Sequence, residues 1–420
     1  AAKKDLRLMA SRRPIRLAGQ SAALNAGRKM SSASVNSDPP PVKRSGAAMS
    51  ALNLLITSNA IRRTDMPRFY PLTVTNIQKT IRDAVVVSLC PGPEANFKFV
   101  QGQYLTFKKN FDGQEIRRSY SICSGLDDNV LQVGIKHVAN GAFSTWANSE
   151  LAVGDVIHAM PPQGRFFAPL DAEAENHYLG FAGGSGITPL LSIIKTTLAR
   201  EPHSRFTLIY ANRRISSIMF REELEDLKNT YIDRLSVLHI LEDDPQEIDL
   251  FSGRITAEKL NVLFEKWISL PQIACAFICG PEPMMTSIAE GLSHHGLAKE
   301  KIKYELFKSN QPGRLALKTN TNITHENPAK TNVTVTIDGA SSSFEMRRDQ
   351  SILQAALENN LDAPFSCQAG VCSTCRCKVI EGDIEMVANH ALQDDEIAKG
   401  YALSCQSYPL SDHLIVQYDQ

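Results

Sequence analysis

The sequence lacks both a long uninterrupted hydrophobic run and an excess of either charge. Its most apolar stretch, residues 178–194, is broken by four glycines and a proline. It therefore falls short of the ~18 apolar residues that predict a membrane-spanning helix. The 45 Lys and Arg residues balance the 45 Asp and Glu residues. We expect no membrane span, and the overall charge does not indicate a nucleic-acid-binding protein.

The length and the cysteines bound the class of protein. At roughly 100–200 residues per domain, two or three domains are expected. With 43% hydrophobic residues among 420, each can have its own core. The nine cysteines are odd in number, and five lie in the last 54 residues. This clustering favours a metal site over a disulfide framework.

Residues 1–65 form a basic leader, with twelve Lys and Arg residues against three Asp. An Arg-rich, Ser-rich and acid-poor leader can be an organellar transit peptide. The alternatives are a disordered tail or residues upstream of the true start, because the chain begins with Ala and offers Met49 and Met66 as later starts. We favour a disordered or non-native leader.

Residues 66–171 contain short β-forming runs separated by turn formers such as Asp112-Gly113 and Gly154-Asp155. Many short strands with little helix predict a small antiparallel β-barrel. The strands are expected at 70–75, 84–89, 103–107, 130–136 and 156–160.

In residues 172–308, strand-like and helix-like segments alternate, which predicts a parallel α/β sheet with ligand chemistry at the carboxyl ends of its strands. Strands are expected at 178–182, 206–210, 236–240 and 274–279, and helices at 189–198, 219–227 and 284–292.

Residues 309–330 show little apolar periodicity and are predicted to be a linker with a span of about 25 Å. A third unit follows at 331–420. We expect strands at 333–337 and 343–346, a helix at 351–358 and then a Cys-rich loop.

The C-terminal cysteines Cys367, Cys372 and Cys375 have the spacing C-x4-C-x2-C, and Cys405 follows at a distance. This is the plant-type [2Fe-2S] pattern, in which four thiolates hold two irons. The alternatives are buried structural thiols or a zinc site, but zinc favours two separated C-x2-C pairs, which are absent. Cys377 falls outside the pattern and is expected to be a packed or free thiol.

Two segments of the expected barrel carry groups that suit a flat ring and phosphates. Arg118-Ser119-Tyr120-Ser121 can pair with a pyrophosphate, stack on a ring and hydrogen-bond its edge. An ordinary strand is the alternative. Gly141-Ala-Phe-Ser144 can bind further phosphate oxygens at a helix start.

The expected α/β sheet carries a glycine-rich turn, Gly183-Gly-Ser-Gly-Ile-Thr188, between a strand and a helix. It lacks G-x-G-x-x-G and the Walker lysine, although a helix N-terminus still favours an anion. A plain turn is the alternative. Arg213 and Ser217, after the next strand, suit a 2′-phosphate and favour NADPH over NADH. Cys279-Gly280-Pro281 ends a later strand, where Cys279 is either a core thiol or a nicotinamide contact.

The order R-x-Y-S, G-G-S-G-I-T-P, C-G-P and plant-type cysteines resembles ferredoxin-NADP-reductase-type flavoproteins with a C-terminal β-grasp [2Fe-2S] ferredoxin domain. Within that group the chain is most similar to the reductase subunits of bacterial ring phenylacetyl-CoA epoxidases of phenylacetate degradation. The resemblance covers about 67–418 and includes the segments 111–123, 206–213, 219–221, 277–281 and 400–406.

The resemblance implies a fold of FAD-binding barrel (66–171), NAD(P)-binding domain (172–308) and ferredoxin domain (331–420). It also implies roles for individual residues, with Ser121 near flavin N5 and Cys279 beside the nicotinamide. The expected FAD contacts are Arg118, Tyr120, Ser121, Lys136, Gly141, Phe143, Ser144 and Thr188. The expected NADPH contacts are Gly184, Ser185, Gly186, Thr188, Arg213, Ser217, Cys279, Gly280 and Pro281.

The activity implied is NADPH-dependent reduction of FAD, then of the [2Fe-2S] cluster, then of a di-iron oxygenase, in the bacterial cytoplasm. Alternative acceptors are a fatty-acyl desaturase or a hybrid-cluster protein. A carrier or redox sensor without NADPH turnover is a different class, which the flavin and nicotinamide signatures disfavour.

Three positions depart from the family pattern: Gln101 replaces Pro, Asn140 replaces Gly, and Ala369 replaces Gly in the cluster loop. Asn tolerates left-handed backbone geometry, so flavin binding is still expected. The charge is also unevenly distributed, at +9 in residues 1–65 and −8 in residues 331–420. The acidic C-terminal unit predicts salt-sensitive docking on a basic acceptor surface.

Overall fold

The computed structural model describes residues 69–93, 96–307 and 330–419. The predicted leader lies outside these ranges, as does the predicted linker apart from Lys330. The limits predicted for the domains stay predictions. Among the described residues, no helix is long and apolar enough to span a membrane.

The first sheet is antiparallel, as predicted, with the strand order β4-β3-β6-β1-β2-β5. A bridge between Ile122 and Val133 joins the end of β4 to β5 and closes the barrel. Alternate residues such as Leu72 and Val74 point inward, because side chains alternate along a strand. The elements are β1 (Tyr70–Ile81), β2 (Ala84–Pro91), β3 (Tyr104–Phe111), β4 (Gln114–Ser121), β5 (Leu131–Lys136), α1 (Ala142–Ser149) and β6 (Val156–Ala159).

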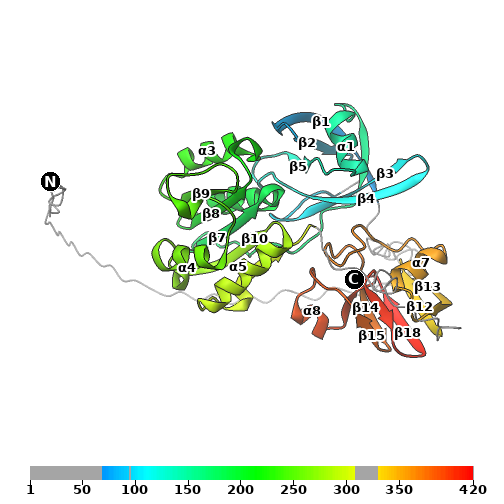
Figure 1. Cartoon of the computed structure of the whole chain (residues 1–420). Coiled ribbons are helices and arrows are strands. Elements are labelled where there is room, and N and C mark those ends of the chain that lie inside the picture. The colour runs from blue at the N-terminus through cyan, green and yellow to red at the C-terminus, as the bar shows by residue number, and fades with distance from the viewer. Residues whose placement is uncertain (1–68, 94–95, 308–329, 420) are drawn as a thin grey trace, which may run out of the picture. The chain divides into compact units, whose positions relative to one another are not determined.

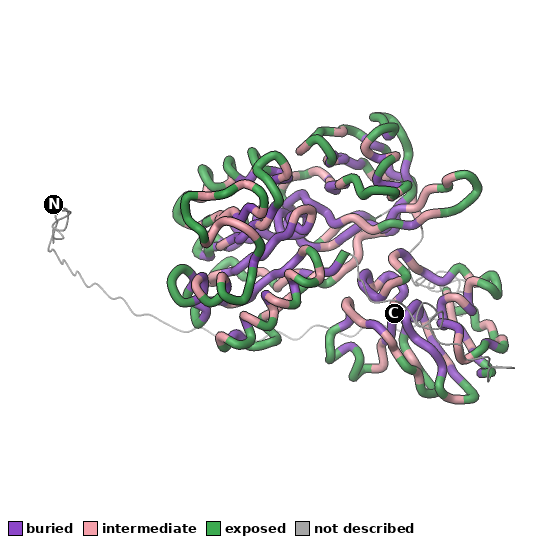
Figure 2. The backbone as a smooth tube through the Cα atoms, viewed as in Figure 1, coloured by how far each residue is buried: buried purple, intermediate pink, exposed green. Residues whose placement is uncertain are grey.

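The second sheet is parallel, with the order β11-β10-β7-β8-β9, and its strands are largely buried (Figures 1 and 2). Tyr178 and Ala182 of β7 pack with α2 and α3, whereas Leu179 and Phe181 pack with α4 and α5, so helices cover both faces. The main elements are β7 (His177–Gly183), α2 (Ile187–Arg200), β8 (Arg205–Asn212), α3 (Arg221–Thr230), β9 (Leu235–Leu241), α4 (Ala257–Lys266), β10 (Ile273–Cys279), α5 (Glu282–His294) and β11 (Ile302–Glu305).

Short 3-10 helices connect several of these elements: η1 (Gly184–Gly186), η2 (Ile215–Ser217), η3 (Asp249–Phe251), η4 (Leu270–Gln272) and η5 (Lys299–Lys301). The helix predicted from Met219 begins at Arg221, because Phe220 has a left-handed backbone (φ 57°) that a helix cannot include. Helix α4 and strand β11 were not among the predicted elements.

The C-terminal unit has the mixed strand order β13-β12-β18-β14-β16, in which only β12 and β18 are parallel among the described pairs. Helix α7 packs Ile352, Leu353 and Ala356 into the core, and its N-cap Ser351 accepts the Gln354 N–H at 3.2 Å. This is the expected β-grasp fold. Its elements are β12 (Lys330–Ile337), β13 (Ala340–Arg347), α7 (Ile352–Glu358), β14 (Arg376–Glu381), β15 (Ile384–Met386), α8 (Asp394–Ala398), β16 (Tyr401–Leu403), β17 (Ser407–Pro409) and β18 (His413–Gln417).

Candidate electron-transfer site

The four predicted cluster cysteines come together in the C-terminal domain. Cys367, Cys372 and Cys375 lie in the loop between α7 and β14, and Cys405 lies between β16 and β17. The thiols of Cys367 and Cys372 are within hydrogen-bonding distance of each other, as are those of Cys375 and Cys405. The four thiols therefore form two pairs.

Backbone N–H groups of the loop point at these sulfurs. The N–H groups of Ala369 and Val371 each lie 3.4 Å from Sγ of Cys367, and the N–H of Cys367 lies 3.4 Å from Sγ of Cys372. Such donors stabilise a thiolate. Ala369, which replaces the expected glycine, still directs its N–H at the sulfur.

The loop curls through three residues with positive φ, namely Gln368 (54°), Gly370 (74°) and Ser373 (47°). A Cβ at Gly370 would lie 2.8 Å from the carbonyl oxygen of Ala388, so a side chain there would push the loop away from that segment. The close approach also lets the His390 N–H donate to the Gly370 carbonyl at 2.9 Å. Glycine is therefore needed at this point of the loop.

The donor set fits a two-iron cluster. Among the described residues, no group of three or more His, Cys, Asp or Glu is placed to hold a single metal ion. Two thiol pairs instead match two irons, each with two thiolate ligands. The hydrogen bond between the paired thiols lowers the pKa of Cys367 to about 6 and raises that of Cys372. Cys377 is fully buried in the domain core, and burial raises its pKa, as expected for a packed thiol.

Most of the predicted flavin contacts lie on β4 and at the nearby start of α1. Arg118 is exposed and donates from Nη1 to the Arg117 carbonyl at 2.7 Å. The Tyr120 ring lies 5.6 Å from the Phe143 ring and 6.1 Å from the Phe107 ring, centroid to centroid. The structure thus places an aromatic surface beside an exposed guanidinium, which suits a flat ring joined to a pyrophosphate.

Helix α1 begins next to these aromatic residues. Its N-cap Gly141 makes no side-chain cap, and its first turn has no acidic residue, so the positive end of the helix is free for an anion. Ser144 donates to the Gly141 carbonyl at 3.1 Å and accepts the Val138 N–H at 3.1 Å. Its hydroxyl therefore organises the loop. Asn140 has φ 62°, the left-handed geometry expected from its place before Gly141.

Lys136 ends β5, and its Nζ lies 3.9 Å from the Asp83 carboxylate. This ion pair is on the strand edge that leads into the α1 loop. The role of Lys136 toward a flavin stays a prediction.

The predicted nicotinamide loops meet at the carboxyl ends of β7 and β10. A Cβ on Gly186 would collide with the Cys279 carbonyl oxygen, and one on Gly183 would lie 2.7 Å from Cδ of Pro281. A Cβ on Gly280 would lie 2.5 Å from Cε of Met284. These glycines let the two loops pack against each other.

Helix α2 begins directly after the first of these loops. Gly184 has φ +53° and lies in η1, directly before α2. The Thr188 hydroxyl donates to the Ser185 carbonyl at 3.0 Å, and α2 has no acidic residue in its first turn. The start of α2 therefore suits a phosphate.

Arg213 and Ser217 follow β8, at the same edge of the sheet. Arg213 is exposed, whereas the neighbouring Arg214 is 3.5 Å from the Asp243 carboxylate. Ser217 accepts the Arg214 N–H at 3.1 Å and donates to the Arg214 carbonyl at 2.7 Å. The Ser217 hydroxyl thus stabilises η2, and Arg213 is the cation placed to meet a ligand.

The two predicted catalytic residues, Ser121 and Cys279, meet at Glu305. Ser121 donates to Oε2 of Glu305 at 3.0 Å, and Cys279 pairs with Glu305 across β10 and β11. Burial raises the pKa of Glu305 to about 8. Burial also raises the pKa of Cys279, and the charge of Glu305 raises it further. We call these three residues the junction. It joins the barrel to the carboxyl edge of the parallel sheet.

Glu305 was not among the predicted site residues. A signal was available, because the alternating segment Ile302-Lys-Tyr-Glu305 precedes the predicted linker and ends in an acid. A carboxyl with a pKa near 8 can hold or release a proton near neutral pH. The junction can therefore combine a hydroxyl donor, a neutral thiol and a titrating acid.

Known protein families match each of the three described domains. The oxidoreductase FAD-binding domain model matches residues 71–167, and the oxidoreductase NAD-binding domain model matches 181–290. The 2Fe-2S iron-sulfur cluster binding domain model matches 335–410. Fold and site together define an oxidoreductase that uses FAD, a nicotinamide nucleotide and a [2Fe-2S] cluster.

The chain belongs to the family of ferredoxin-reductase-type flavoproteins with a C-terminal [2Fe-2S] domain. It is 41% identical to a subunit of the 1,2-phenylacetyl-CoA epoxidase of Escherichia coli K12, over 84% of this chain and 99% of that protein. It is 32% identical to the ferredoxin reductase component of 3-ketosteroid-9-alpha-monooxygenase of Rhodococcus rhodochrous, over 83% and 96% of the two chains.

A solved structure of phthalate dioxygenase reductase has the same fold. It matches with a TM-score of 0.51 and 25% identity, over 83% of this chain and 98% of that one. The predicted fold class, cofactors and enzyme class are confirmed, while the roles of individual site residues stay predictions.

Proposed function

We propose that this chain is the reductase component of a phenylacetyl-CoA epoxidase, taking electrons from NADPH and delivering them to a di-iron oxygenase subunit. The observation that carries the proposal is the 41% identity to the epoxidase subunit across 99% of that protein's length. Similarity over all three domains supports the same roles for the FAD-binding, NAD-binding and [2Fe-2S] domains in electron transfer.

Bound FAD and the [2Fe-2S] cluster would supply the conversion of a two-electron donor into single electrons. The chain's own residues would bind and orient these cofactors. Arg118, Tyr120 and the start of α1 are placed to hold FAD, and the four paired cysteines are placed to hold the cluster. The glycines of the β7 and β10 loops leave room for a nucleotide at the carboxyl edge of the sheet.

At the junction, the Ser121 hydroxyl is oriented by Glu305 at 3.0 Å. The thiol of Cys279 is fully buried at the end of β10, and burial raises its pKa, so it stays neutral beside the proposed nicotinamide site. Glu305 holds a proton on its carboxyl up to about pH 8 and releases it as the pH rises further.

NADPH rather than NADH is proposed as the electron donor. Exposed Arg213 follows β8, where the adenosine ribose lies in open α/β sheets, and a cation there favours a 2′-phosphate. The acceptor would dock through a basic surface, since residues 331–420 carry five basic and thirteen acidic side chains. A bacterial cytoplasmic location stays a prediction of the resemblance.

A second acceptor is favoured by a specific observation. The 32% identity to a 3-ketosteroid monooxygenase reductase component spans 96% of that relative. A steroid-hydroxylating oxygenase is therefore the second candidate. The fatty-acyl desaturase and the hybrid-cluster protein stay predictions, as does the carrier or sensor.

The test is reconstitution of the FAD- and cluster-loaded chain with phenylacetyl-CoA epoxidase subunits, NADPH and phenylacetyl-CoA. Formation of the epoxide, dependent on this chain, supports the proposal. A 3-ketosteroid monooxygenase supplied in parallel serves as the matched control. Turnover with the steroid enzyme alone would move the acceptor to that system, and failure of NADPH to bleach the flavin would overturn the reductase assignment.

A further inference from the structure

The β3–β4 hairpin has two chemically different faces. Its register is regular from Tyr104 opposite Ser121 to Phe111 opposite Gln114. Because opposed residues of an antiparallel pair share a face and successive residues alternate, Tyr104, Thr106, Arg117, Ser119 and Ser121 lie on one face. Leu105, Phe107, Arg118 and Tyr120 lie on the other.

The second face forms the flavin side. Leu105 and Phe107 are buried in the barrel core, and the Tyr120 ring packs beside Phe107 and Phe143. Arg118 extends from the same side into solvent. All the predicted flavin contacts of β4 except Ser121 therefore lie on this face.

The first face contacts the ferredoxin domain, along the segment that carries three cluster cysteines. Ser119 Oγ lies 2.9 Å from Ser366 Oγ, and the Arg117 guanidinium lies 3.4 Å from Asp362 Oδ1. The same guanidinium lies 4.1 Å from the centre of the Phe365 ring. We call residues 362–375 the cluster segment.

Tyr104 makes the contact nearest to the predicted iron ligands. Its hydroxyl donates to the carbonyl oxygen of Cys372 and lies 3.3 Å from Thr374 Oγ1 and 3.4 Å from Ser373 Oγ. The side chain is buried, so these contacts are shielded from water. Its strand partner is Ser121 of the junction.

We infer that Tyr104 is a positioning residue for electron transfer, whose hydroxyl holds the cluster segment at Cys372 against the strand pair that carries the flavin contacts. The inference rests on the proposed reductase function. Tyr104 neither gains nor loses an electron in this role. It sets the gap between the two cofactor sites, and the fold's contribution to a cofactor enzyme is this kind of placement.

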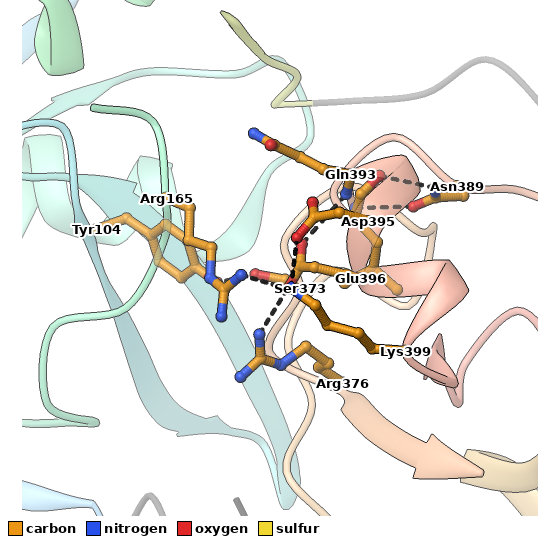
Figure 3. Close-up of polar contacts among 10 residues, drawn as sticks. Tyr104, Arg165, Ser373, Arg376, Asn389, Gln393, Asp395, Glu396 and Lys399 are labelled. Atoms are coloured by element: carbon orange, nitrogen blue, oxygen red, sulfur yellow. Dashed lines mark hydrogen bonds and ion pairs between the residues drawn. The ribbon is translucent and has the colours of Figure 1, made fainter. Parts of the chain in front are cut away.

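A second contact allows the role of Tyr104 to be tested separately from domain docking. Arg165 of the barrel domain and Arg376 of the ferredoxin domain lie 2.8 Å and 2.6 Å from the Glu396 carboxylate (Figure 3). Glu396 is only 2% exposed. This ion triad does not involve Tyr104, so loss of one hydroxyl leaves it in place.

The test is Tyr104→Phe in the full chain loaded with FAD and cluster. Stopped-flow mixing with NADPH follows flavin bleaching and cluster bleaching at separate wavelengths. We expect flavin bleaching at the wild-type rate and cluster bleaching slowed about fivefold to tenfold, the factor that corresponds to one lost buried hydrogen bond. Cluster bleaching at the wild-type rate would overturn the inference, as would equal slowing of both phases.

A readout independent of turnover is amide hydrogen exchange in the same protein. Exchange should accelerate in residues 366–374 of Tyr104→Phe and stay unchanged in α7. The matched control is Tyr70→Phe on β1, whose ring packs on Phe97 in the same barrel. It should change neither readout.

Ser366→Ala is the second variant, because it removes the Ser119 contact from the ferredoxin side. It should slow cluster bleaching in the same direction by a smaller factor, and unchanged cluster bleaching in both variants would refute the two-faced hairpin. Failure of wild-type flavin to bleach would instead refute the proposed function. If the wild-type chain shows both bleaching phases and still does not serve the epoxidase, the proposed acceptor is wrong, and cluster bleaching in Tyr104→Phe still decides the inference.

Discussion

The cluster loop and the junction are built in opposite ways. Three of the four cluster cysteines lie within residues 367–375, on one loop. The junction instead takes Ser121 from β4, Cys279 from β10 and Glu305 from β11, which belong to two different sheets. The first site depends on local spacing, whereas the second depends on how the barrel and the parallel sheet are packed together.

The largest expected effect is loss of the cluster, which tests whether the cluster loop and the junction work independently. Cys372→Ser should abolish the cluster absorbance and all reduction of an acceptor, because three thiolates cannot complete the two-iron set. Reduction of the flavin by NADPH should persist, measured as bleaching in the visible spectrum. The control is Cys377→Ser, a buried thiol outside the set, which should retain the cluster. Loss of flavin reduction in Cys372→Ser would show that the regions are not independent.

The next effect tests the loop contact beside the junction. Gly186→Ala places a methyl group against the Cys279 carbonyl, so we expect a loss of about 1–3 kcal/mol in the free energy of unfolding. The KM for NADPH should also rise. The control is Gly92→Ala, where a Cβ meets nothing within 4 Å. Equal stability of the two variants in thermal melts would contradict the close approach of these loops.

A smaller effect concerns nucleotide choice at the far end of the same edge. Arg213→Ala should lower kcat/KM for NADPH about tenfold relative to NADH, because it removes a hydrogen-bonded charge from a 2′-phosphate. Arg205→Ala, at the opposite end of β8, is the matched control and should leave the ratio unchanged. An unchanged ratio in Arg213→Ala would point to NADH, or to another cation.

A further effect, read by titration and not by activity, is a pH dependence of the free energy of unfolding that comes from Glu305. Its folded pKa of about 8 lies above its ordinary value of 4.5, so the folded state favours the protonated acid. The stability linked to this group is fully present below about pH 4.5 and is lost progressively as the pH rises toward 8. Glu305→Gln should flatten that decline in chemical denaturation between pH 5 and 8.

The control for this titration is Glu265→Gln, an exposed residue of α4, which should keep the wild-type slope. If Glu305→Gln also kept that slope, the carboxyl would not be protonated in the folded protein, and the junction would act through Ser121 and Cys279 alone.

Much of the fold follows from periodicity. The barrel strands, the parallel βαβ series and helix α7 were all predicted, because alternation with period two or with helical spacing is written locally. Helix α4 and strand β11 were missed. Strand β11 has only the four residues Ile302–Glu305, of which Ile302 is the one aliphatic residue, so it shows no run of buried apolar residues.

The site residues also divide into those that a local sequence pattern predicts and those that it does not. Cys367, Cys372, Cys375 and Cys405 could be predicted as cluster ligands from their spacing alone, because a two-iron cluster imposes that spacing on the chain that wraps it. Arg118 and Tyr120 could be assigned by motif. Glu305 and Tyr104 could not, because their significance lies in the partners that they meet, namely Ser121 and Cys372.

Local chemistry and spacing were thus enough to predict the cofactors, the order of the domains and the cluster ligands, since each is indicated by residue types and spacings that can be read along the sequence. Packing specified the rest. The pairing of β10 with β11 places Glu305 beside Cys279, and the register of β3 with β4 turns Tyr104 toward the cluster segment. Both depend on contacts between distant segments, whose free energy is realised only when the strands pair and the domains meet.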